Sequence, residues 1–439
     1  MQNMQPPATR RSPEYAKSSS RVKPEPYSQS IKEVSKCISP ISRASVLCSK
    51  RRLPMHSPLG MRDRLDRERP EGVEGEVTAN IPVTGKSLDS IRVLIISSRH
   101  PTKRENEEEK RKFGRMCNAL FLAGLIGEQL TIRSVRDLMG YLQYSEPDVV
   151  LNALTFSKND AETFQDVMEL LRERNYGCIG TSAEALTLIG SKDDLRDLWW
   201  RSDIRIPPYF SIRRTEDGSI ADKDWTESAR NFPYLVRPGT GAESDDPRFH
   251  AIAESAAELR MRIGALMLTF DNVLVEEFLG NEKDARRFAV GWIGNKDRSI
   301  VMPSELRLSD GLVTGMVTER DISRHRAIVA PVSDERLRDD LERFARAALE
   351  IAGARDFARL DILKVGNRLY ALDIKVQPAV PDPLFDACAL ISGLDANQSV
   401  TAMFVAGFAR LFLEGVAVIA IPSRLRSMMP KPVFSILYG

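Results

Sequence analysis

The stretch RLDILKVGNRLYALDIKVQP, residues 359–378, has the pattern of two short strands joined by a tight turn. Gly366 and Asn367 mark the turn, because these residue types adopt the backbone angles that short hairpin loops require. A buried hairpin would be apolar throughout, yet each strand carries an aspartate, Asp361 in the first and Asp373 in the second. The segment therefore raises the question of what two carboxylates on neighbouring strands face.

The length of the turn decides whether the two aspartates meet. With a two-residue loop, Asp361 lies opposite Leu372 and Asp373 points to the other side, whereas a three-residue loop places Asp361 across from Asp373 at about 5 Å. Two carboxylates at that distance repel unless a cation lies between them, so the second register predicts Mg²⁺ or a basic partner. The alternative is a solvent-facing hairpin edge with scattered charges. Along each strand, Arg359 shares a face with Asp361, and Lys375 shares one with Asp373.

Length and composition predict a multidomain protein with reduced cysteines. The chain has 439 residues, and single cores rarely grow beyond roughly 250. The five cysteines are scattered without a CxxC pair, which favours free thiols and a cytoplasmic location. The most apolar stretch, residues 402–422, is interrupted by Arg410 and Glu414, so no membrane-spanning segment is expected.

The first 85 residues differ in composition from the rest of the chain. They contain 15 Lys and Arg against 9 Asp and Glu, while the whole chain has a net charge of only +2. Pro, Ser and charged residues dominate without apolar periodicity, which predicts a disordered basic tail over 1–85. A transit peptide or a nucleic-acid-binding arm would have a similar composition, but a plain extension is the main expectation, and nucleic acid is an unlikely partner.

Alternating strand and helix patterns follow from residue 86 onward. Apolar runs at 91–98 and 147–156 are typical of strands of a parallel sheet, and 110–125 and 161–174 have helical periodicity. Further along, the patterns predict a strand entering a Gly-rich loop (232–249), a helix (251–266) and a strand–turn–strand unit (272–295). A helix ending at Gly353 (333–353) follows, and the end of the chain (430–439) holds packing groups or a strand.

The order of these motifs resembles the ATP-grasp superfamily and, within it, D-alanine:D-alanine ligases. The resemblance covers about 91–415 and is carried by DVVLNAL, by IGTSAEALTLIGSKDDLRDLWWRSDIRIPPYF, by YLVRPGTG, by VLVEEFLGNE, by VMPSEL, and by ARLDIL with YALDIKVQPA. It implies an α/β (α+β) chain with an N-terminal parallel-sheet pre-ATP-grasp domain. The implied parts are a tail (1–85), this domain (86–184), two ATP-grasp subdomains (185–278 and 279–415) and a C-terminal extension (416–439).

The resemblance also implies cofactors and site residues. Enzymes of this kind use ATP and Mg²⁺ to convert a carboxylate into an acylphosphate that an amine then attacks. Asp361 and Asp373 would bind Mg²⁺, and Arg359 would stabilise the transferring group. Lys192 and Arg237 would contact the ATP phosphates. The remaining implied nucleotide contacts are the loop glycines Gly239 and Gly241, the adenine hinge Glu276, Glu277, Phe278 and Leu279, and the ribose acceptor Glu282.

The sequence departs from the family pattern where catalysis would occur. Lys375 replaces a neutral metal ligand, so two bound Mg²⁺ ions are not expected, and its ammonium could contact phosphate directly. Ala379 replaces a glycine, and Pro383 replaces a serine whose hydroxyl it cannot imitate. Two functions follow as hypotheses. The first is a carboxylate–amine ligase with small-molecule substrates other than D-alanine, for which a homodimer is one option. The second is an inactive ATP-grasp homologue that binds nucleotide or a partner as a regulatory module.

Overall fold

The computed structural model describes part of the chain, namely residues 76–79, 91–99, 103–154, 161–215, 231–240, 249–308, 327–376, 382–416 and 421–438. The chain divides into two compact units, 1–68 and 69–439, and every described residue belongs to the second. Most of the expected disordered tail therefore lies outside the described residues. Within it, Glu76–Ala79 form strand β1, which differs from the expectation for these four residues because they pair with a sheet edge.

The first sheet has the strand order β1-β3-β2-β4-β5 and confirms the parallel sheet expected from the sequence. β2 pairs in parallel with β3 and β4, and only β1 is antiparallel, at the edge. β2 reads as a continuous apolar run because both of its faces are covered. The elements are β2 (Arg92–Ser98), α3 (Lys103–Leu122), β3 (Ile126–Ile132), α4 (Val135–Leu142), β4 (Val149–Asn152), α5 (Ala161–Glu173), β5 (Gly177–Ile179), α6 (Ala183–Gly190) and α7 (Lys192–Arg201).

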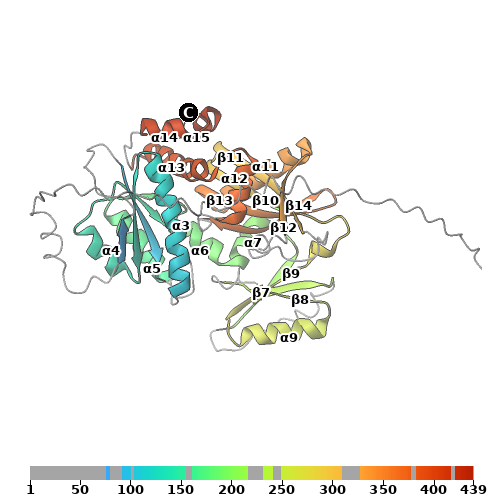
Figure 1. The fold of residues 1–439 in the computed structure, drawn as a ribbon. Coiled ribbons are helices and arrows are strands. Elements are labelled where there is room, and N and C mark those ends of the chain that lie inside the picture. The colour runs from blue at the N-terminus through green and yellow to red at the C-terminus, as the bar shows by residue number, and fades with distance from the viewer. Residues whose placement is uncertain are drawn as a thin grey trace, which may run out of the picture. The chain divides into compact units, whose positions relative to one another are not determined.

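The second sheet is smaller and antiparallel, with the order β6-β9-β7-β8. One face packs on a single helix, α9, in a separate core that contains Val236, Leu259 and Val275 (Figure 1). Its elements are β6 (Tyr209–Arg213), β7 (Tyr234–Pro238), β8 (Ala251–Ala253), α9 (Ala256–Met267) and β9 (Asn272–Glu277), and the short 3-10 helix η3 (Leu279–Asn281) follows β9.

The third sheet contains the hairpin and has the order β12-β11-β10-β13-β14, antiparallel throughout. Val290 and Trp292 of β10 lie in one core with α11, whereas Ala289 and Ile293 lie in another core with α12 and α13. The alternation of strand side chains thus separates two covered faces. The elements are β10 (Arg286–Asn295), β11 (Arg298–Leu308), β12 (Ala327–Pro331), α11 (Glu335–Ile351), β13 (Asp356–Val365), β14 (Arg368–Val376), α12 (Pro383–Ile391) and α13 (Ala396–Leu413).

Helix α13 connects the first and third sheets. It packs against α3 and β5 and also against β10 and β13, which explains why its middle part, Ser399 to Leu411, is buried on every side. Among the described residues, no helix has both the length and the apolarity needed to cross a membrane. The chain ends in α14 (Ser423–Met428) and α15 (Lys431–Tyr438), so the alternative of a closing strand is wrong: Val433, Phe434 and Leu437 have helical spacing and pack on the core.

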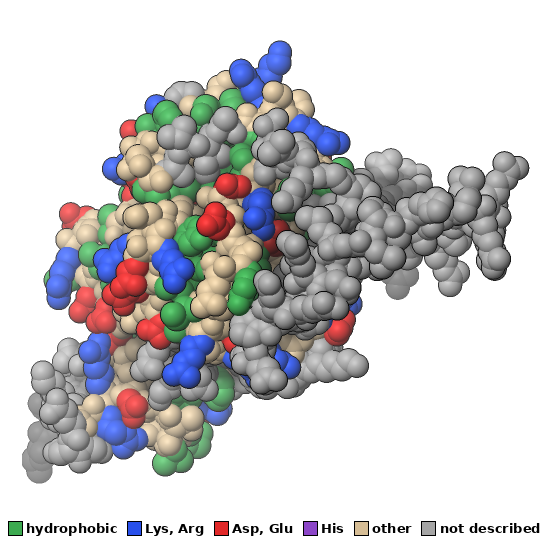
Figure 2. Space-filling model, turned by 90° about the vertical axis from the view of Figure 1, so that its left-hand side faces the viewer, with side chains coloured by type: hydrophobic (Ala, Val, Ile, Leu, Met, Phe, Trp, Pro, Cys, Tyr) green, Lys and Arg blue, Asp and Glu red, His purple; other side chains and the backbone are tan. Residues whose placement is uncertain are grey.

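One face of the molecule, drawn in Figure 2, carries basic and acidic side chains interspersed with apolar and neutral ones. The described residues of this face form no continuous basic stripe of the kind that typically binds nucleic-acid phosphates. The picture therefore adds nothing in favour of a nucleic-acid partner.

Candidate functional site

The hairpin answers the question of register in an unexpected way. Its turn has two residues, Gly366 and Asn367, because Val365 pairs with Arg368. A two-residue loop was expected to keep the aspartates apart, and that expectation is wrong, because a bulge shifts the register between Asp361 and its neighbour Ile362. Ile362 pairs with Ala371, Leu372 is the extra residue, and Asp361 lies directly opposite Asp373.

The bulge is stabilised by the segment that begins with α7. The carbonyl oxygen of Leu372 accepts a hydrogen bond from Nη2 of Arg196, and the amide of Ala371 donates to the carbonyl of Arg205 at 2.9 Å. Backbone groups that a bulge removes from the strand ladder are costly when buried without a partner. These two contacts therefore stabilise the register in which the aspartates face each other.

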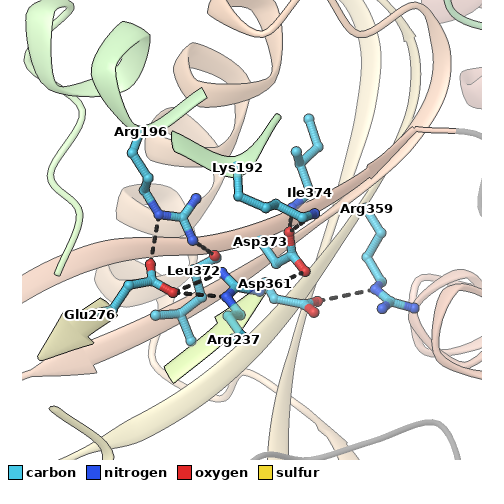
Figure 3. Close-up of polar contacts among 9 residues, drawn as sticks. All are labelled: Lys192, Arg196, Arg237, Glu276, Arg359, Asp361, Leu372, Asp373 and Ile374. Atoms are coloured by element: carbon cyan, nitrogen blue, oxygen red, sulfur yellow. Dashed lines mark hydrogen bonds and ion pairs between the residues drawn. The ribbon is translucent and has the colours of Figure 1, made fainter. Parts of the chain in front are cut away.

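Asp373 lies against two cations from other parts of the chain (Figure 3). Nζ of Lys192 is 2.8 Å from Oδ1 of Asp373, and Nη1 of Arg237 is 3.8 Å from Oδ2. Lys192 is the first residue of α7, is almost fully buried, and donates its backbone amide to the carbonyl of Gly239 at 2.8 Å. The structure thus brings together Lys192, Arg237 and Asp373, which the sequence assigned to one phosphate and metal site.

Glu276 forms the second part of the same cluster. Its carboxylate is buried and lies between two arginines: Nε of Arg196 is 2.8 Å from Oε1, and Nη2 of Arg237 is 2.8 Å from Oε2. Burial opposes ionisation, but the charges of both arginines outweigh it and hold the pKa of Glu276 below its usual value. The side chain expected at the adenine is therefore engaged in fixing Arg237, and any nucleotide contact here would come from the backbone that follows.

Arg359 lies opposite Lys375 in the hairpin, next to the Asp361 and Asp373 pair. Its Nε is 3.1 Å from Oδ1 of Asp361, and its Nη1 donates to Asp382, the residue that caps the N-terminus of α12. Burial raises the pKa of Asp361, the charge of Arg359 opposes this, and Asp373 adds to it. One face of the hairpin thus carries two carboxylates beside two cations.

This arrangement limits what metal the site could hold. The described residues contain no group of three or more His, Cys, Asp or Glu side chains placed to bind a metal ion. Two facing aspartates do fit a single Mg²⁺, which binds through one or two carboxylates and takes its other ligands from phosphate and water. Lys375, on the same face as Asp373, disfavours a second divalent ion by charge repulsion.

The remaining predicted nucleotide residues lie around this cluster or outside the described residues. A side chain at Gly239 would meet Asn272 at 2.6 Å, so the backbone there passes too close for another residue type. Glu277 accepts from Asn231 at 2.9 Å, Phe278 is buried, and the amide of Phe278 donates to the carbonyl of Pro233. Outside the described residues lie Gly241 and Ala379.

Two further positions are described by the structure. Glu282 is exposed and lines a pocket of about 380 Å³ together with Arg368 and Tyr370 of the hairpin. Pro383 is the first residue of α12, directly after Asp382. Proline fits this helical position because the first amides of a helix have no intrahelical acceptor. Pro383 is therefore explained by helix geometry.

Sequence reasoning missed three residues of the site. Arg196 follows Lys192 by one helical turn on α7, and this i, i+4 spacing could have indicated a shared face. Asp382 immediately precedes a proline, which is a signal for the start of a helix. The same aspartate also positions Arg359 by accepting its hydrogen bond. Arg287 lies on the third sheet near Asp361, and nothing in the local sequence distinguishes it from its neighbour Arg286.

The fold agrees with that of known ligases, although sequence similarity is low. No family model matches the chain. A D-alanine–D-alanine ligase from Pediococcus pentosaceus is 22% identical over 175 residues, which are 39% of this chain and 47% of that protein, so the match spans about half of that relative.

Solved structures give a broader match. A D-alanine–D-alanine ligase from Bacillus anthracis, also solved in complex with ATP, has a TM-score of 0.58 and 14% identity, covering 74% of this chain and 100% of the ligase. The enzyme from Coxiella burnetii has the same TM-score at 12% identity, covering 74% of this chain and 96% of that one. VanG, a D-Ala:D-Ser ligase from Enterococcus faecalis, has a TM-score of 0.54 at 13% identity, covering 72% of this chain and 100% of that one. The chain therefore has the ATP-grasp fold of these ligases.

Proposed function

We propose that the protein is an ATP-dependent carboxylate–amine ligase that works through an acylphosphate and uses substrates other than a pair of D-alanines. The observation that supports this most is the pairing of Asp361 with Asp373 on one face of the hairpin, with Lys192 and Arg237 against Asp373. These residue types suit a ligand with dense negative charge, because phosphoryl transfer depends mainly on positioning and electrostatic stabilisation.

In the proposed reaction, an oxygen of the substrate carboxylate attacks the γ-phosphorus of ATP, the bond to the bridging oxygen breaks, and ADP leaves. The amine then attacks the carbonyl carbon of the acylphosphate, the bond to the phosphate oxygen breaks, and phosphate leaves as the nitrogen loses a proton. Mg²⁺ between Asp361 and Asp373 would supply Lewis-acid neutralisation of phosphate charge. Lys192 and Arg237 would hold phosphate oxygens, and Arg359 would face the reacting group.

Other residues would orient the nucleotide. The backbone from Glu277 to Leu279, after β9, would contact the adenine, and Glu282 would accept from the ribose hydroxyls. Glu276 would keep Arg237 fixed by the ion pair at 2.8 Å. Lys375 would take the place of a second metal ion by placing its ammonium against a phosphate oxygen, since like charges discourage another cation there.

The test is a coupled assay for ADP and phosphate release with ATP, Mg²⁺ and a panel of carboxylates and amines. We expect release that requires one carboxylate and one amine, and a product whose mass equals their sum minus water. The variant Asp373→Asn should abolish the reaction, while Asp297→Asn, an exposed aspartate in the turn between β10 and β11, serves as the matched control. A folded protein that binds ATP and stays silent across the panel would contradict the ligase assignment.

A second candidate function is that of a non-catalytic nucleotide-binding or partner-binding module. It is favoured by Lys375, which lies opposite Arg359, and by the ion pairs that already neutralise Asp373. Calorimetry would then show nucleotide binding without turnover. If the variant Lys375→Asn gained turnover, this second candidate function would be weakened, because the rest of the site would then be able to catalyse.

Location and partners belong to the same proposal. The described cysteines, Cys117, Cys178 and Cys388, are all unpaired, which supports a reducing compartment and hence the cytoplasm. Small-molecule carboxylates and amines would be the partners, and a homodimer is a further prediction, which sedimentation would test.

A further inference from the structure

Arg287 lies on the face of the third sheet that carries the paired aspartates. It is the second residue of β10, and its strand neighbours across the sheet are Leu363 and Leu306. Two residues along β10, Ala289 lies opposite Asp361. Because side chains two positions apart on a strand share a face, Arg287 is one row away from the aspartate pair.

The row of Arg287 lies towards the turn of the hairpin. Leu363, next to Arg287, is paired with Tyr370 on β14. Tyr370 in turn lines the pocket of about 380 Å³ with Glu282 and the turn residues of the hairpin. Arg287 therefore lies between the aspartates, where phosphates would bind, and the segment that we assign to the ribose.

Within the part of the chain that the structure describes, the guanidinium of Arg287 has no counter-ion. The side chain as a whole is half-buried, but its Nε is shielded from solvent and has no hydrogen-bond acceptor there. Burial lowers the pKa of Arg287 to about 10, and only the more distant charge of Asp361 opposes this. Arg286, the next residue, is different: it pairs with Glu305 at 2.9 Å and lies over the ring of Phe288.

Four other cations at the site have acidic partners. Arg196 and Arg237 share Glu276, Lys192 contacts Asp373, and Arg359 contacts Asp361 and Asp382. A shielded donor without an acceptor costs free energy, and a buried charge costs more unless an opposite charge joins it. Arg287 is thus placed to receive a negative group from a ligand.

We propose that Arg287 binds a phosphoryl oxygen of the nucleotide, on the ribose side of the paired aspartates. This rests on the proposed function, since it assumes that the nucleotide extends from the aspartates towards the hinge after β9. The anion is the α-phosphate, the phosphate next to the ribose, and the chemistry is a phosphate oxyanion held by a guanidinium.

The experiment measures binding of ATP, ADP, adenosine and inorganic tripolyphosphate by calorimetry to the full chain and to three variants. Arg287→Met removes the charge, Arg287→Lys keeps it without the planar fork, and Arg286→Met is the matched control on the neighbouring position. We expect Arg287→Met to weaken ATP and ADP roughly 10- to 100-fold and to leave adenosine unchanged, because charged hydrogen bonds contribute on that scale. Arg287→Lys should be intermediate, and Arg286→Met should bind like the wild type.

The remaining outcomes distinguish a failure of the inference about Arg287 from a failure of the proposed ligase function. If Arg287→Met binds ATP as tightly as the wild type, the inference about Arg287 is wrong while nucleotide binding stands. An equal loss of adenosine and ATP would show a merely structural role and would also overturn it. A higher KM for the acceptor carboxylate, with ATP affinity unchanged, would assign Arg287 to the substrate and not to the nucleotide. If the wild type binds no nucleotide, the proposed function fails. Tripolyphosphate binding that is lost in Arg287→Met would then still support an anion site at Arg287, and tripolyphosphate binding that is unchanged would rule it out.

Discussion

Asp356 and Asp373 lie on the same hairpin in contrasting surroundings. Asp356 is fully buried and accepts hydrogen bonds from Gly180 at 2.7 Å, from Asn295 at 3.0 Å, and from Arg410 at 2.7 and 2.8 Å. The side chain of Asp373 is 18% exposed, and it accepts from Nζ of Lys192 at 2.8 Å and from the amide of Ile374 at 3.0 Å, with Arg237 more distant. The first aspartate is therefore closed off from solvent, whereas the second is partly open to it.

The neighbours of the two aspartates differ in the same way. Around Asp356, the hydrogen-bond donors come from different parts of the fold: Gly180 directly after β5, Asn295 at the end of β10, and Arg410 of α13. Shielded donors without an acceptor in the described part of the chain occur near both aspartates: Nε of Arg355 beside Asp356, and Nη1 of Arg196 near Asp373. What separates the two aspartates is access to solvent: the carboxylate of Asp356 is fully buried in a junction that stabilises the fold, whereas that of Asp373 is partly exposed and can meet a ligand.

Arg410→Met gives the largest expected effect. It leaves the carboxylate of Asp356 buried without its cation, and breaking a buried pair costs about 3–5 kcal/mol of unfolding free energy. Urea unfolding measures this, and the ATP affinity of the folded fraction should not change. The reverse pattern, with stability kept and nucleotide affinity lost, would remove the distinction between junction and site.

Glu276→Gln should have the next largest effect on stability, about 2–3 kcal/mol, because the amide still accepts a hydrogen bond but no longer neutralises Arg196 and Arg237. The lowered pKa of Glu276 means that its contribution is present above the ordinary value of 4.5 and is lost as the pH falls through the folded value. The free energy of unfolding, measured from pH 7 to pH 3, should therefore fall more steeply for the wild type than for the variant. Parallel curves would contradict the assigned role.

Much of the fold follows from local sequence patterns, whereas the bulge does not. Apolar runs and helical spacing locate strands in each of the three sheets, such as β2, β7 and β13, and the helices α3, α9 and α11, because burial imposes those periods. The bulge at Leu372 depends on Arg196 and Arg205, which are distant in sequence and reach the hairpin only in the folded chain. A turn motif alone gives the wrong register for that reason.

The candidate site divides along the same line. Charged residues expected together, such as Lys192 and Asp373, do meet, because the order of motifs fixes which strand ends and helix starts converge. The engagement of Glu276 by two arginines could not be predicted, since one of them, Arg196, looks like an ordinary helix residue. Nor does sequence show that Arg287 lacks a counter-ion while Arg286 has one, because the difference is which face of the sheet each side chain occupies.

Asp382 separates a capping role from a positioning role. Its carboxylate accepts from the amides of Leu384 and Phe385 and also from Arg359. Asp382→Asn keeps a good N-cap but loses the charge, so stability should stay near that of the wild type while kcat falls about tenfold as Arg359 loses its orientation. Asp382→Ala should in addition lose about 1 kcal/mol of unfolding free energy. If kcat is unchanged in Asp382→Asn and falls only in the less stable Asp382→Ala, the charge of Asp382 does not matter for turnover and the residue is only a cap.

Asp361→Asn carries a small expected change in stability, and its sign is opposite to that expected for Arg410→Met and Glu276→Gln. Burial raises the pKa of Asp361, so the folded state disfavours the ionised form. The contribution of such a group is fully present below its unfolded pKa and is lost as the pH rises through the folded value, so at pH 7 the asparagine variant should be more stable, by up to about 1 kcal/mol. The advantage should vanish at pH 3, where both side chains are neutral. Ligase turnover should be lost at the same time, and a variant that loses both stability and turnover would place Asp361 with Asp356, as a structural aspartate, and not with Asp373.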